Sequence, residues 1–544
     1  MNRIFKIISF IMIVLIIATS LVACVKDHNK KTSPTTVNTT NMSQAEIENT
    51  YPINTEVTLS YWTPLNSKVS ANYASLGDTP FAKELEKRTG VKINYMHSLI
   101  GNESEALNLM IASMDLPDII DADMSYFSGG PETLIGDNII LKLNDIIDQY
   151  APNFKKILQI DAELDKMVRT DESSYFGFPY ITDTEEDLCW RGPGIRKDWL
   201  DELGLQLPET IEEWYTALKA FKEKKNVIAP FSWNGSGTNA LRAFSEGSFI
   251  GAYGVYLGFY QENGKVKYGP YEKEYKDFLA TMAKWYKEKL IDQNFASTDK
   301  KGLDANIING NSGATILNRG GGFTLYIPAL EKADPKSDLQ PTAFPVLNKG
   351  DKPKFGHWLQ KYRNIAAVIT SKCRNVKIAA KWLDYGYTEE GSMLNNYGIE
   401  NVSYTIKNGI PKFTDEVLKN PDGKPVDESL AQYARIVYSG PFATRSMYNQ
   451  LNIYEAQRNA DLMWPKTDMV KHVMPPVTHS KNEGTQYSKI MNDVDTYLQE
   501  YSVKVIMGIE SLNNFDAYIG QLKNTGIEDA ISIQQTALDR YKRR

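Results

Sequence analysis

The chain has 544 residues, 42% of them hydrophobic, and a formal net charge of −6 at pH 7. This length is enough for two or more domains with sizeable cores. The mildly acidic balance argues against the strongly basic classes that bind nucleic acid, and the one basic run, Tyr541–Arg544, is more often a chain end than a binding site.

The N-terminus has the layout of a secretory signal peptide. Arg3 and Lys6 precede the apolar run 7–17, which is shorter than the roughly 20 apolar residues of a membrane span. The next stretch, Leu21–Cys24, resembles the lipobox of bacterial lipoproteins, in which the cysteine is lipidated and becomes the new N-terminus. The alternative is an ordinary signal peptide with an incidental cysteine. Because the apolar run, the lipobox and the following sequence agree, residues 1–23 are predicted to be a lipoprotein signal peptide and Cys24 the lipidated residue.

A polar segment, residues 24–50, follows the predicted cleavage point. It is rich in Lys, Thr, Asn and Ser, so it cannot bury enough apolar surface to offset the entropy of ordering. We expect a flexible tether that spans roughly 30 Å on average. Loss of Arg3 and Lys6 with the signal leaves 59 basic and 67 acidic residues, a net charge of −8. The segment therefore predicts a globular body held near a membrane but outside it.

The first part of the body alternates strand and helix patterns. Strands are predicted at 56–62, 91–95 and 117–120, and helices at 81–89 and 104–113. This order implies a parallel sheet covered by helices. Ligands of such sheets bind beyond the carboxyl ends of the strands, so Trp62, Asp121 and Asp123 fall at a predicted cleft.

The middle of the chain continues in the same way. Helices are predicted at 143–150, 152–160, 210–224 and 271–290, strands at 175–180, 231–237 and 313–317, and a strand running into a helix at 191–204. Thr210 and Glu213 form a capping box, which marks the start of a helix. Three glycines follow Arg319, and a tight turn there is favoured over a close approach to a ligand.

The last third is mostly helical. An apolar run at 364–370 predicts a fully buried strand, and helices are predicted at 377–385, 487–501, 515–522 and 527–541. Two cysteines remain besides Cys24. Outside the cytoplasm Cys189 and Cys373 can pair, but two small buried residues are the favoured interpretation.

Four stretches carry a resemblance to a known family: 175–180, 195–204 with 208–214, 396–404, and 507–541. They span nearly the whole mature chain. In their order the chain resembles family 1 extracellular solute-binding proteins, the receptors of ATP-driven sugar importers, and within them the LplA/LipO-like lipoprotein branch. None of the four stretches is a fingerprint for a particular sugar.

The resemblance implies an α/β, two-lobe periplasmic-binding-protein-like fold of the type II class. Each lobe would be a mainly parallel sheet flanked by helices, with extra C-terminal helices. Crossing segments are expected near 179–184, 345–358 and 402–411. The N-terminal lobe would comprise residues 52–180 plus 356–405, and the C-terminal lobe residues 181–345 plus 406–544, with the ligand cleft between them.

One departure from the family concerns metal binding. Many relatives insert an Asp/Asn/Gly-rich calcium loop after the helix that ends here near Lys224, whereas this chain has only four residues before Ile228. The run Asp121-x-Asp123-x-Ser125 begins like a calcium loop, but Tyr126 stands where glycine is required. We expect no structural calcium and no cofactor.

Motifs of catalysis are missing from the sequence. The five histidines form no H-E-x-x-H, and 235–237 and 310–313 do not fit G-x-S-x-G. The glycines of 192–194 lack the third glycine of a dinucleotide loop. The acid run Glu185–Asp187 can in principle hold a glycosidase pair, but a solvated face is favoured. The sequence therefore predicts a binding protein that is not an enzyme.

Aromatic residues carry the positive signal. Sugars pack their C–H faces on aromatic rings, and their hydroxyls need carboxylate, amide and guanidinium partners. Four tryptophans lie at strand ends or in turns, whereas Trp199, Trp214, Trp285 and Trp382 lie in predicted helices and are assigned to the core. Taken singly, each strand-end tryptophan fits core packing as well as ligand contact. The candidate ligand-binding residues are Trp62, Asp123, Tyr126, Trp190, Arg191, Trp233, Asn234, Arg319 and Trp358.

The function that these observations predict is a monomeric, lipid-anchored receptor on the extracytoplasmic face of the cell membrane, with palmitate as a lipid on Cys24. It would capture an oligosaccharide by hinge closure and present it to the transmembrane subunits of an ABC permease. Nucleic acid is not an expected partner. Two alternatives stay open: a surface enzyme that degrades polysaccharides, and a sensory co-receptor of the same fold.

Overall fold

A computed structural model describes residues 50–544 except 99–100, 128–129, 238–239 and 437–439. Contacts within the chain separate residues 1–50 from a compact unit, Tyr51–Arg544, and all that follows concerns this unit. The predicted signal peptide, the tether and Cys24 therefore lie outside the described residues.

The first sheet has five strands in the order β2-β1-β3-β10-β4. These are β1 (Thr58–Trp62), β2 (Lys92–Met96), β3 (Ile119–Asp123), β4 (Phe178–Ile181) and β10 (Tyr362–Ile369). β1 runs parallel to β2 and β3, whereas β10 runs antiparallel to both β3 and β4. The apolar run that predicted a buried strand is the inner part of β10, where Ala366–Ile369 are all buried.

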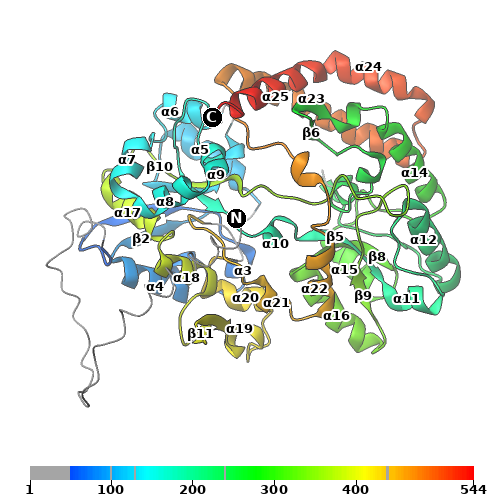
Figure 1. Cartoon of the computed structure of the whole chain (residues 1–544), viewed down its shortest axis with the longest axis horizontal. Coiled ribbons are helices and arrows are strands. Elements are labelled where there is room, and N and C mark those ends of the chain that lie inside the picture. Colours follow the sequence, from blue (N-terminus) through cyan, green and yellow to red (C-terminus); the bar gives the residue numbers. More distant parts are fainter. Residues whose placement is uncertain (1–49, 99–100, 128–129, 238–239, 437–439) are drawn as a thin grey trace, which may run out of the picture. The chain divides into compact units, whose positions relative to one another are not determined.

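Eight described helices of seven or more residues in this part of the chain flank the first sheet (Figure 1). They are α4 (Pro80–Thr89), α5 (Glu103–Ser113), α6 (Gly130–Gly136), α7 (Asn144–Tyr150), α8 (Pro152–Ile160), α9 (Ala162–Val168), α17 (Val376–Tyr385) and α18 (Glu389–Tyr397). α4 shows why the predicted bounds hold. Thr79 caps its start, Pro80 occupies its first turn, and Gly90 ends it in the left-handed region at φ 73°.

The second sheet has three strands in the order β8-β5-β9. They are β5 (Arg191–Arg196), β8 (Ala314–Asn318) and β9 (Leu339–Pro341). Helices of the same part of the chain are α11 (Lys197–Glu202), α12 (Ile211–Lys225), α13 (Arg242–Glu246), α14 (Tyr275–Lys287), α15 (Lys300–Ile308) and α16 (Gly321–Ala333). The predicted capping box is present at the start of α12, between Thr210 and Glu213. A hairpin of β6 (Phe259–Glu262) and β7 (Lys265–Tyr268) lies between α13 and α14 in the chain.

The prediction of a mainly parallel sheet is wrong for the second sheet, because β5 runs antiparallel to both of its neighbours. β8 and β9 run in the same direction and are joined through α16, as a helical crossover requires. β5 lies between them in the opposite direction. β10 lies in the same way between β3 and β4 in the first sheet. In each sheet, the strand that breaks the parallel order is the one that enters directly from the other sheet.

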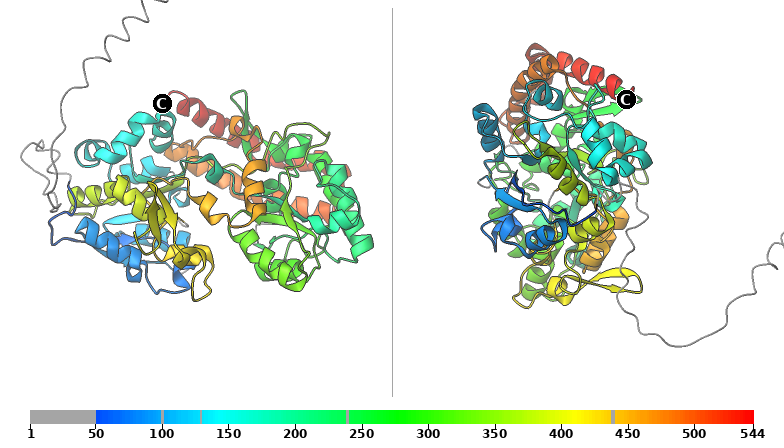
Figure 2. Two further views of the ribbon diagram at one scale, coloured as in Figure 1. Left: turned by 60° about the horizontal axis from the view of Figure 1, so that its bottom comes forward. Right: turned by 90° about the vertical axis from the view of Figure 1, so that its left-hand side faces the viewer.

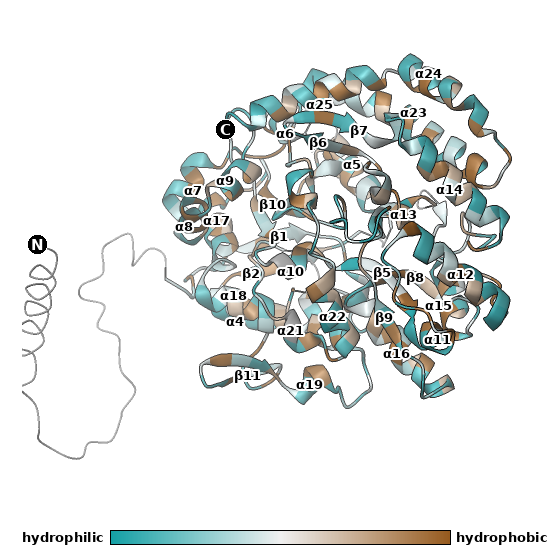
Figure 3. Ribbon diagram, turned by 45° about the vertical axis from the view of Figure 1, so that its right-hand side comes forward, coloured by the Kyte–Doolittle hydropathy of each residue, from teal (hydrophilic) through white to brown (hydrophobic). Residues whose placement is uncertain are grey.

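Three C-terminal helices close the unit: α23 (Lys481–Ile506), α24 (Phe515–Thr525) and α25 (Ile527–Tyr541). Teal and brown alternate along them in Figure 3, as expected for amphipathic helices. Their apolar faces share a core with α12 and α14. The end of the chain reaches α9, where Tyr541 donates a hydrogen bond to Glu163 at 2.6 Å and Arg544 contacts Asp171. Figure 2 shows this end beside the cyan helices.

Residues 404–447 do not lie where the sequence placed them. The predicted third crossing, 402–411, instead forms a hairpin of β11 (Tyr404–Lys407) and β12 (Ile410–Phe413), followed by α19 (Asp415–Leu418) and α20 (Val426–Ala431). This segment packs against the first sheet: Gln432 O accepts from Phe81 N at 3.1 Å, and Arg435 pairs with Asp121 at 2.9 Å. These contacts tie Gln432 and Arg435 to elements of the first sheet, and the division of the chain into two lobes stays a prediction.

Two further features follow from the described residues. The predicted strand 231–237 is wrong, because only single bridges form, from Phe231 to Ile291 and to Ala314. A β-carbon on Gly235 would stand 2.0 Å from Phe295 O, so this turn requires glycine. Within the described ranges, no helix combines the length and the apolar character needed to cross a membrane.

Candidate functional site

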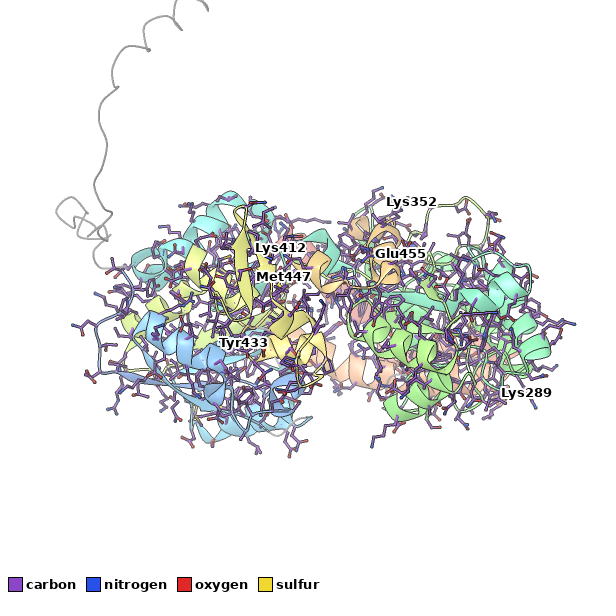
Figure 4. All side chains as sticks on the ribbon, turned by 90° about the horizontal axis from the view of Figure 1, so that it is seen from below. Lys289, Lys352, Lys412, Tyr433, Met447 and Glu455 are labelled. Carbon is purple, nitrogen blue, oxygen red and sulfur yellow. The ribbon has the colours of Figure 1, made fainter. Side chains whose placement is uncertain are left out.

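Three segments connect the elements of the two sheets and lie side by side. The first joins β4 to β5, and its Thr182 N donates to Lys361 O of the segment from β9 to β10 at 2.8 Å. The third segment pairs with the first through Ile181, whose N donates to Phe442 O at 3.0 Å and whose O accepts from Thr444 N at 2.8 Å. It continues through α21 (Tyr448–Leu451) to α22 (Glu455–Met463), which packs on β9. Figure 4 labels Met447, which directly precedes α21, and Glu455, the first residue of α22.

An aromatic and cationic group lies on these connections. Trp190 follows α10 (Glu185–Leu188) and is half-buried, and its ring centroid is 5.1 Å from that of His357 in an edge-on contact. The Arg191 guanidinium carbon lies 4.7 Å from the centroid of the Trp190 ring. This distance is that of a cation–π contact. A ring, an imidazole and a guanidinium are thus gathered where the first two connections meet.

Glu246 of α13 holds two arginines of this group. Arg191 Nε donates to Asn318 Oδ1 at 2.5 Å, and its Nη1 forms an ion pair with Glu246. Arg242 Nε donates to the same carboxylate at 2.6 Å. The Glu246 carboxylate therefore pairs with two guanidinium groups, those of Arg191 and Arg242.

Arg363 stands close by without a carboxylate partner. Its guanidinium carbon lies 5.4 Å from the Tyr180 ring, and among the described residues it forms no ion pair and its buried Nε has no hydrogen-bond partner. Burial and the charges of Arg191, Arg363 and Arg242 lower the pKa of His357 to about 3. His357 is therefore neutral at physiological pH, because a fourth positive charge is disfavoured in this group.

Several polar atoms on the same connections lack partners within the described ranges. They are Thr182 Oγ1, Thr184 Oγ1, His357 Nδ1 and Tyr362 Oη. Buried polar groups in folded proteins nearly always have a hydrogen-bond partner, in the protein or in bound water or ligand. Buried side-chain atoms without a partner also occur elsewhere in the described residues, for example at Trp214 and Trp382, so these four atoms alone do not define a site.

The predicted tryptophans have different fates. Trp62 and Trp233 are buried in the cores of the two sheets, and Trp233 Nε1 donates to Ala240 O at 3.1 Å. Trp358 is half-buried and packs against apolar clusters of the second sheet and of the β6–β7 hairpin. Only Trp190 presents its ring beside charged groups. Local position at a strand end did not separate these cases.

The predicted polar residues are also dispersed. Arg319 is 2% exposed and is held between Asp187 at 3.2 Å and Asp461 at 2.6 Å. Asp123 caps a short helical turn, accepting from Ser125 N at 2.9 Å. The remaining two, Tyr126 (40% exposed) and Asn234 (exposed), lie at the surface. The structure thus brings Trp190 and Arg191 together, and their contact with a ligand stays a prediction, as it does for the other candidates.

Sequence reasoning missed three residues of the group: Arg242, His357 and Arg363. His357 directly precedes the candidate Trp358 in the chain. Arg363 directly precedes the apolar run that predicted β10. Its position at the end of a predicted buried strand is the sequence feature that could have made it a candidate. Nothing in the sequence places Arg242 beside them.

Two surface depressions lie elsewhere, along α4. One is lined by residues such as Asn54, Lys83 and Glu86, and the other by Glu84, Arg88, Glu389, Glu390, Glu400 and Tyr404 among others. Among the residues that line them, the first has no aromatic side chain, and the second has one, Tyr404, beside acidic and basic side chains. Neither offers the stacked rings that a sugar needs.

Metal and thiol chemistry add no further site. In the part of the chain that the structure covers, no group of three or more His, Cys, Asp or Glu side chains is arranged to hold a metal ion. The absence of structural calcium stays a prediction. Cys189 and Cys373 are both free and buried, in the cores of the second and first sheets respectively.

Comparisons with known proteins place the chain in a family. FusA of Streptococcus pneumoniae serotype 4, a fructooligosaccharide ABC transporter substrate-binding protein, is 24% identical over 91% of this chain and 92% of its own length. Lipoprotein LipO of Bacillus subtilis is 27% identical over 84% of this chain and 85% of its own.

A solved structure agrees with these relatives. The crystal structure of the alginate-binding protein AlgQ2 without calcium ion superposes with a TM-score of 0.74, at 29% identity, over 90% of this chain and 99% of that one. The predicted α/β solute-binding fold is thereby confirmed. The model of the bacterial extracellular solute-binding protein family matches residues 73–393, well over half of the sequence. The chain therefore belongs to the bacterial extracellular solute-binding protein family.

Proposed function

We propose that the protein captures an oligosaccharide for an ABC importer and releases it unchanged. Family membership supports a binding role, and the names of FusA and AlgQ2 support a sugar as the ligand. The observation that carries the proposal is Trp190, a half-buried ring set between Arg191 and His357 on the connections between the two sheets. An indole face takes the C–H face of a sugar, and the flanking groups take its hydroxyls.

The proposed mechanism is closure of two lobes over the ligand. One lobe would carry the first sheet with residues 404–447, and the other the second sheet with α23–α25. The three neighbouring connections are the elements that would bend, because each sheet has its own core. A sugar that contacts both lobes binds the closed form better, so it shifts the population toward the form that a permease recognises.

The proposed location is the outer face of the cell membrane, with a lipid on Cys24 and residues 24–50 as a tether to a monomeric body. The relative LipO is a lipoprotein by name. Tethering raises the concentration of the receptor near its permease. A Cys24→Ser variant should appear in the medium and support less uptake, while the purified protein keeps its affinity for sugar. Retention of the variant at the membrane would contradict the anchor.

The deciding experiment is a titration calorimetry and thermal-shift screen of the mature chain against neutral and acidic oligosaccharides. We expect at least one sugar to raise the melting temperature and to bind with a stoichiometry of one. The ligand recovered after long incubation should be chemically unchanged. Stabilisation by peptides or metal ions but by no sugar would overturn the proposal, and so would turnover of the bound sugar.

A further inference from the structure

The charges around His357 do not balance. Arg191 and Arg242 share Glu246, and Arg363 has no carboxylate partner among the described residues. Two acids of the first connection pair with other cations: Asp183 lies 3.7 Å from Lys361, and Asp187 pairs with Arg319. We call Trp190, Arg191, Arg242, His357 and Arg363 the His357 cluster. It carries three positive charges and contacts one negative charge.

Other arginines of the interior show how unusual Arg363 is. Arg196 pairs with Asp198 at 2.5 Å, Arg435 with Asp121 at 2.9 Å, and Arg540 with Glu483 at 2.6 Å. Arg363 is half-buried, and a guanidinium that is partly withdrawn from water without an anion is disfavoured. At Arg363 only the Tyr180 ring faces the charge, at 5.4 Å, and the Nε proton has no acceptor. The position is therefore preorganised for an anion that arrives with a ligand.

The shape of the cluster indicates which anion fits. A guanidinium offers a planar pair of donors that matches both oxygens of a carboxylate. Trp190 provides an aromatic face within the same cluster, and His357 Nδ1 offers an unpaired ring nitrogen for a hydroxyl. A ring with hydroxyls and a carboxylate attached to it is a sugar acid.

We propose that the His357 cluster binds the carboxylate of a uronate unit, with Arg363 as its direct partner, so that the ligand is an acidic oligosaccharide. This inference rests on the proposed function and narrows its substrate class. A neutral oligosaccharide would leave Arg363 without an anion and would have to displace water from it without replacing its hydrogen bonds. Binding of such a sugar would be correspondingly weak.

The first test uses the unmodified mature chain and changes only the ligand. Oligomers of galacturonate, glucuronate and mannuronate are titrated, each beside its methyl ester, which keeps the sugar skeleton and removes the charge. We expect one acid to bind at least about tenfold more tightly than its ester, the range of one charge-assisted hydrogen bond. A sulfated oligosaccharide and neutral oligosaccharides complete the panel. Binding of the sulfated sugar alone would overturn the carboxylate assignment.

The second test changes the protein. Arg363→Gln should weaken binding of the acid about tenfold to a hundredfold and leave binding of the ester nearly unchanged. Arg363→Lys keeps the charge but loses the planar fork, so an intermediate loss is expected. Arg374→Gln is the matched control, because Arg374 is exposed beyond the other end of β10 and loses the same charge. Melting temperatures confirm that all variants fold.

The outcomes separate this inference from the proposed function. Equal affinity for acid and ester, equal effects of Arg363→Gln and Arg374→Gln, or binding of neutral sugars alone would overturn the acidic ligand and leave sugar capture standing. If no sugar of any charge binds the unmodified chain, the proposed function itself fails.

Discussion

Two arginines next to strand ends, Arg319 and Arg363, have opposite surroundings. Arg319 follows β8 and is enclosed by Asp187 and Asp461, which tie α10 and α22 to the second sheet. Arg363 lies at the start of β10 and faces the Tyr180 ring, and it pairs with no carboxylate in the part of the chain that the structure describes. The first arrangement satisfies the charge within the protein, and the second leaves it to a ligand. Both arginines lie next to the end of a strand, so the residues around each guanidinium, and not its position along the chain, distinguish the two roles.

Two tryptophans that were predicted to lie at strand ends, Trp233 and Trp190, show the same contrast. Trp233 is 2% exposed and packs against Phe231, Phe244 and Phe295 with centroid distances of 4.9–5.4 Å. Trp190 is half-buried and packs against an imidazole and a guanidinium. The core ring is expected to contribute to stability, and the ring beside charged groups is the one that we propose as a ligand contact.

The largest effect is expected at Arg319. Arg319→Met would leave Asp187 and Asp461 buried without their cation, which costs about 3–5 kcal/mol of the free energy of unfolding. Chemical denaturation measures this loss. Lys481→Met is the control, because Lys481 and its partner Asp137 are largely exposed and their ion pair contributes about 1 kcal/mol or less. Similar losses in the two variants would contradict the structural role of Arg319.

The tryptophans should separate stability from binding. Trp233→Ala removes a fully enclosed ring and should lower the free energy of unfolding by about 3–5 kcal/mol. Trp190→Ala should cost much less stability but weaken sugar binding about tenfold or more, since stacking is lost. Denaturation and calorimetry on both variants check this. If Trp190→Ala binds sugar normally, the site does not include this ring.

The elements of the fold were predictable because hydrophobic periodicity is local. The capping box at Thr210, the glycine after α4 and the apolar run of β10 each gave nearly correct bounds. The direction of β5 was not predictable, because periodicity carries no information about which strand lies beside another. The third connection was misplaced for the same reason. It pairs with Ile181, from which it is more than 250 residues away in the chain.

The site was predictable only in part, for a related reason. Residue type and strand-end position selected both Trp190 and Trp233, and both Arg191 and Arg319. Burial is set by distant partners: Asp187 and Asp461 are 132 and 142 residues from Arg319 in the chain. A single sequence offers no measure of such distances. Arg363 was missed because its significance is the lack of a partner, which only the fold reveals.

The pH dependence of stability tests whether the cluster holds His357 neutral. The pKa of His357 is lowered from 6.5 to about 3 in the folded protein, so the unfolded chain takes up a proton first as the pH falls. The free energy of unfolding therefore decreases as the pH falls below 6.5. His357→Gln should lessen this decrease by about 1 kcal/mol between pH 7 and about 5.5.

Denaturation at a series of pH values checks the expectation for His357. Above pH 7 the histidine is neutral in both states, so the two curves should run parallel there. Parallel curves down to pH 5.5 as well would mean that the arginines and burial do not disfavour the charged imidazole. Such a result would contradict the net positive charge assigned to the His357 cluster, because an excess of cations over Glu246 disfavours a charged imidazole.

The smallest effect is expected at Arg242. Its side chain is 53% exposed and shares Glu246 with Arg191, so it adds charge to the His357 cluster from a distance. Arg242→Gln should weaken binding of an acidic sugar only about twofold to threefold, since exposed charges are screened, and the difference should shrink as salt is added. Stability should change by less than about 0.5 kcal/mol.

Titrations at low and high salt measure the effect of Arg242→Gln, with Lys273→Gln as control. Lys273 is an exposed cation 3.9 Å from Glu274, and it lies outside the His357 cluster. A loss as large as that of Arg363→Gln would mean that Arg242, and not Arg363, meets the carboxylate. Glu246 would then be displaced by the ligand, because it is the only carboxylate among the described residues that pairs with Arg242. A result identical to the control would confine the anion to Arg363 and Arg191.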